Sequence, residues 1–87
     1  MYIIVVYDIG VERVGKVCNY MRQYLPRVQN SVVEGDLSES KLARMKSGLR
    51  KLLVNNHDSV IIWTARDSHW TAREILGVEK LPVSNIL

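Results

Sequence analysis

The sequence predicts a single α+β domain in which two helices cover one face of an antiparallel sheet. Two observations support this fold class. Short apolar runs rich in β-branched residues alternate with two longer segments whose apolar residues fall at helical spacing. The 87-residue sequence contains no repeat, linker or low-complexity tract, so we expect residues 1–87 to form one domain.

The first half of the chain predicts a strand, a helix and an extended stretch. Tyr2–Tyr7 is an apolar run that predicts a buried strand. An amphipathic helix follows, and Pro26 ends it. Its apolar residues are Val14, Val17, Cys18, Met21 and Leu25. Arg27–Gly35 then predicts an extended stretch, in which the pair Asn30-Ser31 fits either a kink in one strand or a tight turn between two.

A second amphipathic helix follows the loop Gly35–Ser38. Either Asp36 or Ser38 can serve as its N-cap, and its leucine pattern ends near Val54. Its other face is cationic, which fits either a solvated surface or a contact with phosphates. The cationic residues are Lys41, Arg44, Lys46, Arg50 and Lys51.

The second half ends in a strand and a tail. Asp58–Ala65 predicts a β-branched strand, and we expect Trp63 to be part of the core rather than to stack on bases. Trp70–Leu76 fits a strand or a short helical turn, and Val83–Leu87 fits a terminal edge strand because Pro82 precedes it. The order β-α-β(β)-α-β predicts a ferredoxin-like fold.

Composition narrows the class of protein. The net charge of +3 is compatible with nucleic-acid binding without requiring it. A single cysteine, Cys18, excludes an internal disulfide and a thiolate zinc site, and suits a reducing compartment. Because no apolar run approaches the roughly 20 residues of a membrane span and no leader is legible, we expect a cytoplasmic protein without a membrane partner. A 47% hydrophobic content in so short a chain favours a homodimer.

Asp8, the acid at the end of the first strand, has two interpretations. It can end the strand or cap the helix that begins just after it. It can also bind a divalent metal ion such as Mg²⁺, which keeps several waters and needs only one or two carboxylates. On a two-residue period Asp8 shares a face with Tyr2, Ile4 and Val6. One Asp8 in each of two chains would suffice for a metal site at a two-fold axis.

The cations around the first helix also have two interpretations, a solvated helix face or a set of phosphate contacts. They are Arg13, Lys16, Arg22 and Arg27. We expect His57 and His69 to be solvated loop residues rather than ligands or bases. The sequence contains no dinucleotide fingerprint, phosphate loop or nucleophile elbow, which excludes those chemistries.

Taken together, these motifs resemble the CRISPR-associated protein 2 family, the small subunit of the spacer-acquisition machinery. The resemblance covers about residues 1–65, and the stretch Arg27–Gly35 (RVQNSVVEG) is its most specific part. Val33 departs from the family, which often has an aromatic residue in that position. The other matching residues are Tyr7-Asp8-Ile9, Arg13, Lys16, Val17 and the strand Asp58–Trp63.

The resemblance implies a ferredoxin-like homodimer. In that dimer Arg27–Gly35 is divided into two strands, and the C-terminal strand, within residues 78–87, pairs with the sheet of the other chain. It also implies a partner, the integrase CRISPR-associated protein 1, and a nucleic-acid ligand that is duplex DNA or single-stranded RNA.

The resemblance further implies a magnesium-dependent endonuclease. Asp8 would be its catalytic and metal-binding residue at the dimer interface, and Arg13, Lys16 and Arg27 would contact nucleic acid. Glu12, beside Arg13 in a short loop, is expected to weaken phosphate binding there. The alternative is a purely architectural scaffold that holds duplex DNA for the integrase without catalysis. A toxin-type RNase or a small-ligand domain on the same fold is a third possibility, because fold does not determine function.

Overall fold

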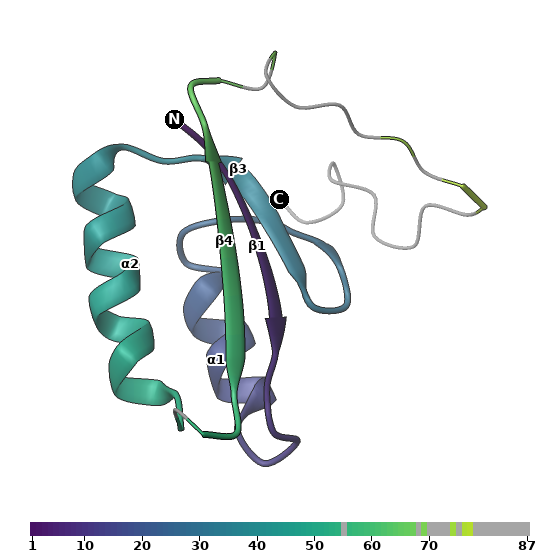
Figure 1. Cartoon of the computed structure of the whole chain (residues 1–87), viewed down its shortest axis with the longest axis vertical. Helices are drawn as coiled ribbons and strands as arrows, with labels where there is room; N and C mark the ends of the chain where they lie inside the picture. The colour runs from purple at the N-terminus through teal and green to yellow at the C-terminus, as the bar shows by residue number, and fades with distance from the viewer. Residues whose placement is uncertain (55, 68, 70–73, 75, 78–87) are drawn as a thin grey trace.

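Two layers make up the part of the chain that the structure describes (Figure 1). The computed structural model describes residues 1–54, 56–67, 69, 74, 76 and 77. One layer is a four-stranded sheet and the other consists of two helices, which confirms the predicted α+β class. The elements are β1 (Tyr2–Asp8), α1 (Val14–Met21), β2 (Arg27–Gln29), β3 (Val32–Asp36), α2 (Glu39–Leu52) and β4 (Ser59–Ala65).

The sheet has the strand order β2-β3-β1-β4, and every neighbouring pair is antiparallel. α1 connects β1 to β2 across β3, and α2 connects β3 to β4 across β1. Because crossovers of this kind are right-handed, both helices lie on the same face of the sheet. This topology is the ferredoxin-like fold that the element order predicts.

The central strand β1 alternates strictly between the two faces of the sheet. Ile3, Val5 and Tyr7 are buried against the helices, whereas Tyr2, Ile4, Val6 and Asp8 face the other way. The core is completed by residues of both helices and of the segments that flank them. The core residues outside β1 are Val17, Met21, Leu25, Val33, Leu37, Leu42, Met45 and Leu49.

The stretch Arg27–Gly35 forms two strands rather than one bent strand, as the family resemblance implies. Asn30 and Ser31 form the turn between them, and Ser31 has a φ of 149°, a conformation that side-chain-bearing residues rarely adopt. The Tyr7 amide donates a 3.0 Å hydrogen bond to the Ser31 carbonyl. The turn is therefore held beside the end of β1, close to Asp8.

The helix boundaries confirm one prediction and correct another. Ser38 is the N-cap of α2, since its hydroxyl accepts a 3.2 Å hydrogen bond from the Lys41 amide. α1 ends at Met21 rather than continuing to Leu25. The Gln23 and Tyr24 amides bond over a shorter, i to i−3 span, so the chain tightens into a turn while Leu25 still reaches the core. Neither helix of the described residues is long and apolar enough to cross a membrane.

The expectation that Trp63 belongs to the core is wrong, because 52% of its surface is exposed. Trp63 lies opposite Ile4 in the β1–β4 register, and Ile4 faces away from the helices. Since the two helices cover only one face of the sheet, the other face of β4 has no cover within the described residues. The predicted segments Trp70–Leu76 and Val83–Leu87, and the swapped strand within 78–87, lie outside the described residues apart from Glu74 and Leu76.

Gly48 allows α1 and α2 to approach each other. The Tyr20 hydroxyl lies 3.2 Å from the Arg44 carbonyl and 3.3 Å from that of Met45, and a Cβ added at Gly48 would overlap this hydroxyl. Gly15, in α1, has no neighbour within 4 Å of such a Cβ. The two helical glycines therefore differ in the space around them and not in their secondary structure.

We expect Gly48→Ala to lower the free energy of unfolding and Gly15→Ala to raise it. Both changes gain up to about 1 kcal/mol of helix propensity, but overpacking against Tyr20 costs about 1–3 kcal/mol at Gly48. Urea titrations of both variants, with Gly48→Ala repeated in a Tyr20→Ala background, measure the difference. Equal effects of the two substitutions would show that the helices do not meet at Gly48.

Candidate functional site

Asp8 is the last residue of β1, and its side chain is exposed on the face of the sheet that the helices do not cover. Ser59 is its partner in β4. The Asp8 side chain makes no hydrogen bond or ion pair with the residues that the structure describes. The helix-capping interpretation is wrong, because the N-cap of α1 is Arg13 and no side chain caps it. Asp8 does end the strand, and its carboxylate remains available to a ligand.

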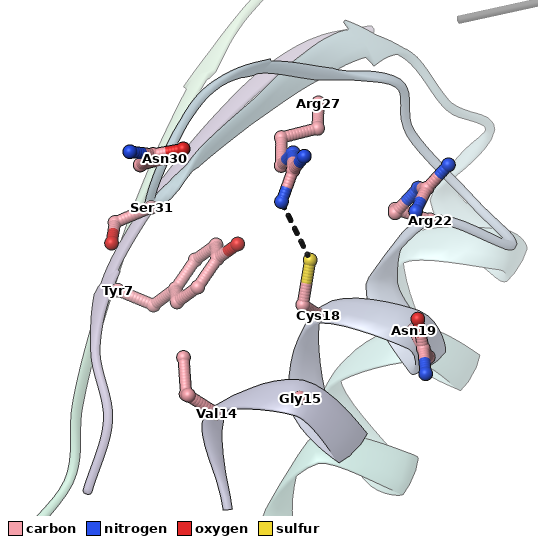
Figure 2. A pocket seen from close by; sticks show the side chains of 9 residues that line it. All are labelled: Tyr7, Val14, Gly15, Cys18, Asn19, Arg22, Arg27, Asn30 and Ser31. Atoms are coloured by element: carbon pink, nitrogen blue, oxygen red, sulfur yellow. Dashed lines mark hydrogen bonds between the residues drawn. The ribbon is translucent and has the colours of Figure 1, made fainter. Parts of the chain in front are cut away.

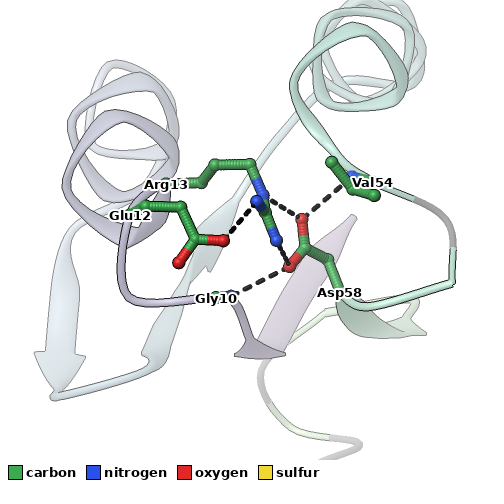
Figure 3. A network of polar contacts seen from close by, with 5 residues as sticks. All are labelled: Gly10, Glu12, Arg13, Val54 and Asp58. Carbon is green, nitrogen blue, oxygen red and sulfur yellow. Dashed lines mark hydrogen bonds and ion pairs between the residues drawn. The ribbon is translucent and has the colours of Figure 1, made fainter.

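A second aspartate, Asp58, has a structural role (Figure 3). Its side chain has no exposed surface. It accepts hydrogen bonds from the Gly10 amide and the Val54 amide, both at 2.9 Å. The Arg13 guanidinium donates two more, each at 2.7 Å, in a bidentate pair. Asp58 thus joins the loop after β1, the start of α1 and the end of α2.

The charges in this network stabilise one another. Hydrogen bonds from Arg13, and then from the two backbone amides, hold the pKa of Asp58 far below its usual range against the opposing effect of burial. The same pair raises the pKa of Arg13. Glu12 accepts a 2.6 Å bond from Arg13, and its pKa is lowered by its own backbone amide and by Arg13. All three groups therefore stay ionised near neutral pH.

The predicted site residues do not converge on one point of a single chain. Asp8 lies on the open side of the sheet, whereas Arg13 is bound to two carboxylates. Asp58 cannot serve as a second metal ligand, since both of its oxygens are already hydrogen-bonded. Within the described residues no group of three potential metal ligands exists. Among the described residues, Asp8 is therefore the available carboxylate at the end of the central strand.

Arg27 and Lys16 lie on the helix side of the molecule. Lys16 is exposed on α1. Arg27, at the start of β2, is half-buried, and its guanidinium donates to the Cys18 sulfur at 3.7 Å. Together with Arg22 it lines a pocket of about 360 Å³ between β1, α1 and the β2–β3 turn (Figure 2). Burial, and secondarily Cys18, raises the pKa of Tyr7, whose ring forms one wall of this pocket.

The face of the sheet opposite the helices is largely apolar, but it also carries the hydrogen-bonded pair of Tyr2 and Glu34. We define the open face as Ile4, Val6, Val32, Ile61 and Trp63, which the β1–β3 and β1–β4 registers place on one side of the sheet. Ile61 and Trp63 are 49% and 52% exposed. Asp8 belongs to the same face, at one end of it. An exposed carboxylate thus borders an exposed apolar surface.

Sequence reasoning missed two features of this region. It gave Asp58 no role beyond its position at the start of a strand, although an acid that follows a polar turn can accept backbone amides. It also treated Cys18 only as a compartment signal and as part of the apolar stripe. The structure brings Cys18 next to Arg27, nine residues away, because α1 packs beside β2. No local spacing rule connects those two residues.

The fold and these positions define a small ferredoxin-like protein with one available carboxylate at the end of its central strand and cations on its helices. The family model of CRISPR associated protein Cas2 matches residues 1–73, and the chain belongs to this family. The predicted family membership is confirmed.

Individual relatives agree with this assignment over their whole length. Proteins named CRISPR-associated endoribonuclease Cas2 from Pyrococcus furiosus and Methanosarcina acetivorans are 49% and 42% identical over 87 residues, the whole of each chain. A crystal structure of Cas2 matches with a TM-score of 0.87 and 38% identity, over 95% of this chain and 93% of the other. The crystal structure of Streptococcus pyogenes Cas2 matches with a TM-score of 0.75 and 26% identity, over 88% of this chain and 100% of the other.

We expect Asp58→Asn to lower the melting temperature by several degrees at pH 7 and to flatten its dependence on acid. Because folding lowers the pKa of Asp58 from its ordinary 3.8, the carboxylate stabilises the fold above about pH 4. That stability is lost as the pH falls through the folded-state pKa. Thermal unfolding of both proteins between pH 7 and pH 2 measures the effect.

Asp67→Asn is the matched control, since Asp67 is half-exposed and pairs only with the exposed His69 among the described residues. If the melting temperature of Asp58→Asn depends on pH in the same way as that of the wild type, the assigned role of the Asp58–Arg13 pair is contradicted.

Proposed function

We propose that this protein is a divalent-metal-dependent nuclease that acts on nucleic acid as a homodimer during CRISPR spacer acquisition. The observation that carries the proposal is Asp8, an exposed acid without a partner among the described residues, at the end of the central strand. Relatives that match the chain over its whole length are named endoribonucleases, which favours single-stranded RNA as one substrate. Association with the integrase CRISPR-associated protein 1 belongs to the same proposal.

Asp8 suits a Mg²⁺ ion because this metal binds oxygen ligands and keeps several waters beside one or two carboxylates. When bound, the metal supplies a polarised phosphate oxygen and a more acidic water. Asp8 itself would hold the ion at the edge of the open face. A single carboxylate from each of two chains would complete the ligand set.

The open face supports the homodimer. Monomeric proteins rarely leave a contiguous apolar patch of this kind uncovered, and such patches mark interfaces. A second copy of the chain presents the same apolar face, so the two surfaces can cover each other about a two-fold axis. Because Asp8 borders this face, the same packing would bring two Asp8 carboxylates to one interface. Dimerisation and metal binding are therefore coupled in the proposal.

Cations on the helix side of the molecule supply the affinity for phosphates. Lys16 on α1 and Arg27 on β2 remain the proposed nucleic-acid contacts, and the cationic side of α2 adds to the field around them. Phosphate contact by Arg13 stays a prediction. Its guanidinium already donates to Glu12 and Asp58, so positioning the loop after β1 is its better-supported role.

The architectural scaffold is the second candidate, and one observation favours it. Within the described residues Asp8 has no general base beside it. The oxygens of Asp58 are already hydrogen-bonded, and neither His57 nor His69 contacts Asp8. A protein with this arrangement can hold duplex DNA through its cations without cutting it. The two candidates differ in whether Asp8 is needed for cleavage.

We expect Asp8→Ala to reduce magnesium-dependent cleavage of single-stranded RNA by at least roughly a hundredfold, in line with the loss of a metal ligand. Binding of RNA and duplex DNA should remain unchanged, because the cations stay in place. Cleavage of labelled substrates with magnesium or with chelator, and filter binding at several salt concentrations, give both readouts.

Asp36→Ala is the matched control. Asp36 is an exposed acid that lies opposite Tyr2 in the β1–β3 register, at the other end of β1. Its removal changes the net charge by the same amount as the removal of Asp8. If wild type, Asp8→Ala and Asp36→Ala all bind duplex DNA and none of them cleaves, the nuclease is rejected and the scaffold is supported. Cleavage that persists in Asp8→Ala would remove Asp8 from the proposed site.

We expect Ile61→Glu to convert the homodimer into a monomer, since it places a charge in the centre of the open face. Light scattering at micromolar concentration measures the molecular mass. Val11→Glu is the control, because Val11 is 86% exposed in the loop between β1 and α1. A wild-type monomer, or an Ile61→Glu dimer, would refute the open-face interface.

A further inference from the structure

A pocket lies between β1, α1 and the β2–β3 turn (Figure 2). Two guanidinium groups, Arg22 and Arg27, line it, and no carboxylate does. Its volume of about 360 Å³ lies at the lower end of the range for small-molecule sites, about 300–1,000 Å³. Its other lining residues are Tyr7, Val14, Gly15, Cys18, Asn19, Asn30 and Ser31.

The guanidinium of Arg27 has no anionic partner in this pocket. It is half-buried, and among the described residues it donates only to the Cys18 sulfur at 3.7 Å, which is a weak acceptor. A partly buried charge is costly unless an anion or strong acceptors satisfy it. Arg22 makes no ion pair with the described residues either. The pocket therefore carries an excess of positive charge that an incoming anion would neutralise.

Neutral donors surround the two cations. The Tyr7 hydroxyl stays protonated near neutral pH, because burial raises its pKa, and it points into the pocket beside Arg27 (Figure 2). Asn19, Asn30 and Ser31 are the other polar residues of the lining. Two guanidinium groups with hydroxyl and amide donors match the oxygens of a phosphate, which arginine binds in bidentate fashion.

We propose that this pocket binds a phosphate monoester, through Arg22 and Arg27. The chemistry is shared by two sources, the terminal phosphate of a nucleic-acid strand and a free mononucleotide, and inorganic phosphate is a probe with the same oxygens. The inference rests on the proposed function only in taking nucleic acid as one of these sources.

This site is separate from Asp8. Tyr7 and Asp8 are consecutive residues of β1, so their side chains lie on opposite faces of the sheet. The pocket lies on the helix face and Asp8 on the open face. A phosphate bound to Arg22 and Arg27 is thus not a ligand of a metal at Asp8, and the two sites can be lost independently.

The sole cysteine of the chain gives a direct readout of the pocket, because Cys18 lines it. We expect inorganic phosphate, adenosine monophosphate or a 5′-phosphorylated oligonucleotide to slow alkylation of Cys18 in the native protein. A 5′-hydroxyl oligonucleotide of the same sequence should have a much smaller effect. Calorimetric titration of each ligand measures the affinity.

Arg22→Ala and Arg27→Ala should weaken phosphate binding by roughly tenfold or more, the effect of losing a charge-assisted bond. Arg66→Ala is the control with the same loss of charge, since Arg66 is exposed after β4 and lies outside the pocket. Arg27→Lys should recover only part of the affinity, because an ammonium group cannot bind two oxygens as a fork. Arg22 is exposed, so Arg22→Ala provides the test even if Arg27→Ala fails to fold.

The sources are separated by competition. If the 5′-phosphorylated strand binds more tightly than the mononucleotide, and the mononucleotide does not displace it, the pocket is assigned to a strand end. Effective competition by the mononucleotide or inorganic phosphate assigns it to a free ligand. Absence of calorimetric binding of every phosphate, or an equal loss of affinity in Arg66→Ala, overturns the proposal. Asp8→Ala should keep phosphate binding in full, so failure of the nuclease proposal is distinguishable from failure of this one.

Discussion

The buried pair of Asp58 and Arg13 is the interaction on which the arrangement of this molecule depends. Asp58 accepts four hydrogen bonds, and they come from the loop after β1, from the first turn before α1 and from the end of α2. A carboxylate without exposed surface is stable only when its oxygens are satisfied in this way. The pair therefore fixes the direction in which the chain leaves β1, and with it the position of Asp8.

The two aspartates show how one residue type takes opposite roles. Asp58 is buried and fully bonded, which holds it ionised but removes it from chemistry. Asp8 ends the neighbouring strand but does not cap α1. The turn before α1 is closed instead by a hydrogen bond from the Arg13 amide to the Gly10 carbonyl, and Arg13 is the N-cap. A carboxylate that the fold does not use is available to a ligand. The structural role of Asp58 thus supports the functional interpretation of Asp8.

Much of this architecture follows from local patterns in the sequence. The β-branched runs, the helical spacing of apolar residues and Ser38 as an N-cap predicted the element order, since each depends on neighbours within a few residues. Trp63 could not be placed correctly, because an apolar strand has the same pattern whether one or both of its faces are covered. The contact of Cys18 with Arg27 and the bonding of Asp58 were also beyond prediction. Both depend on which elements pack together.

The side chains of β1 alternate between the two faces of the sheet and so contribute to two different kinds of surface. Successive residues of a strand project to opposite faces, so Tyr7 contributes to a cationic pocket under α1 while Asp8 borders an apolar surface. Anions are attracted to the first face, and cations and a second apolar surface to the other. A dimer formed through the open face would leave both pockets outside the interface, each next to its own α1. Contacts with phosphates on the helix sides would then be independent of any metal held between the two chains.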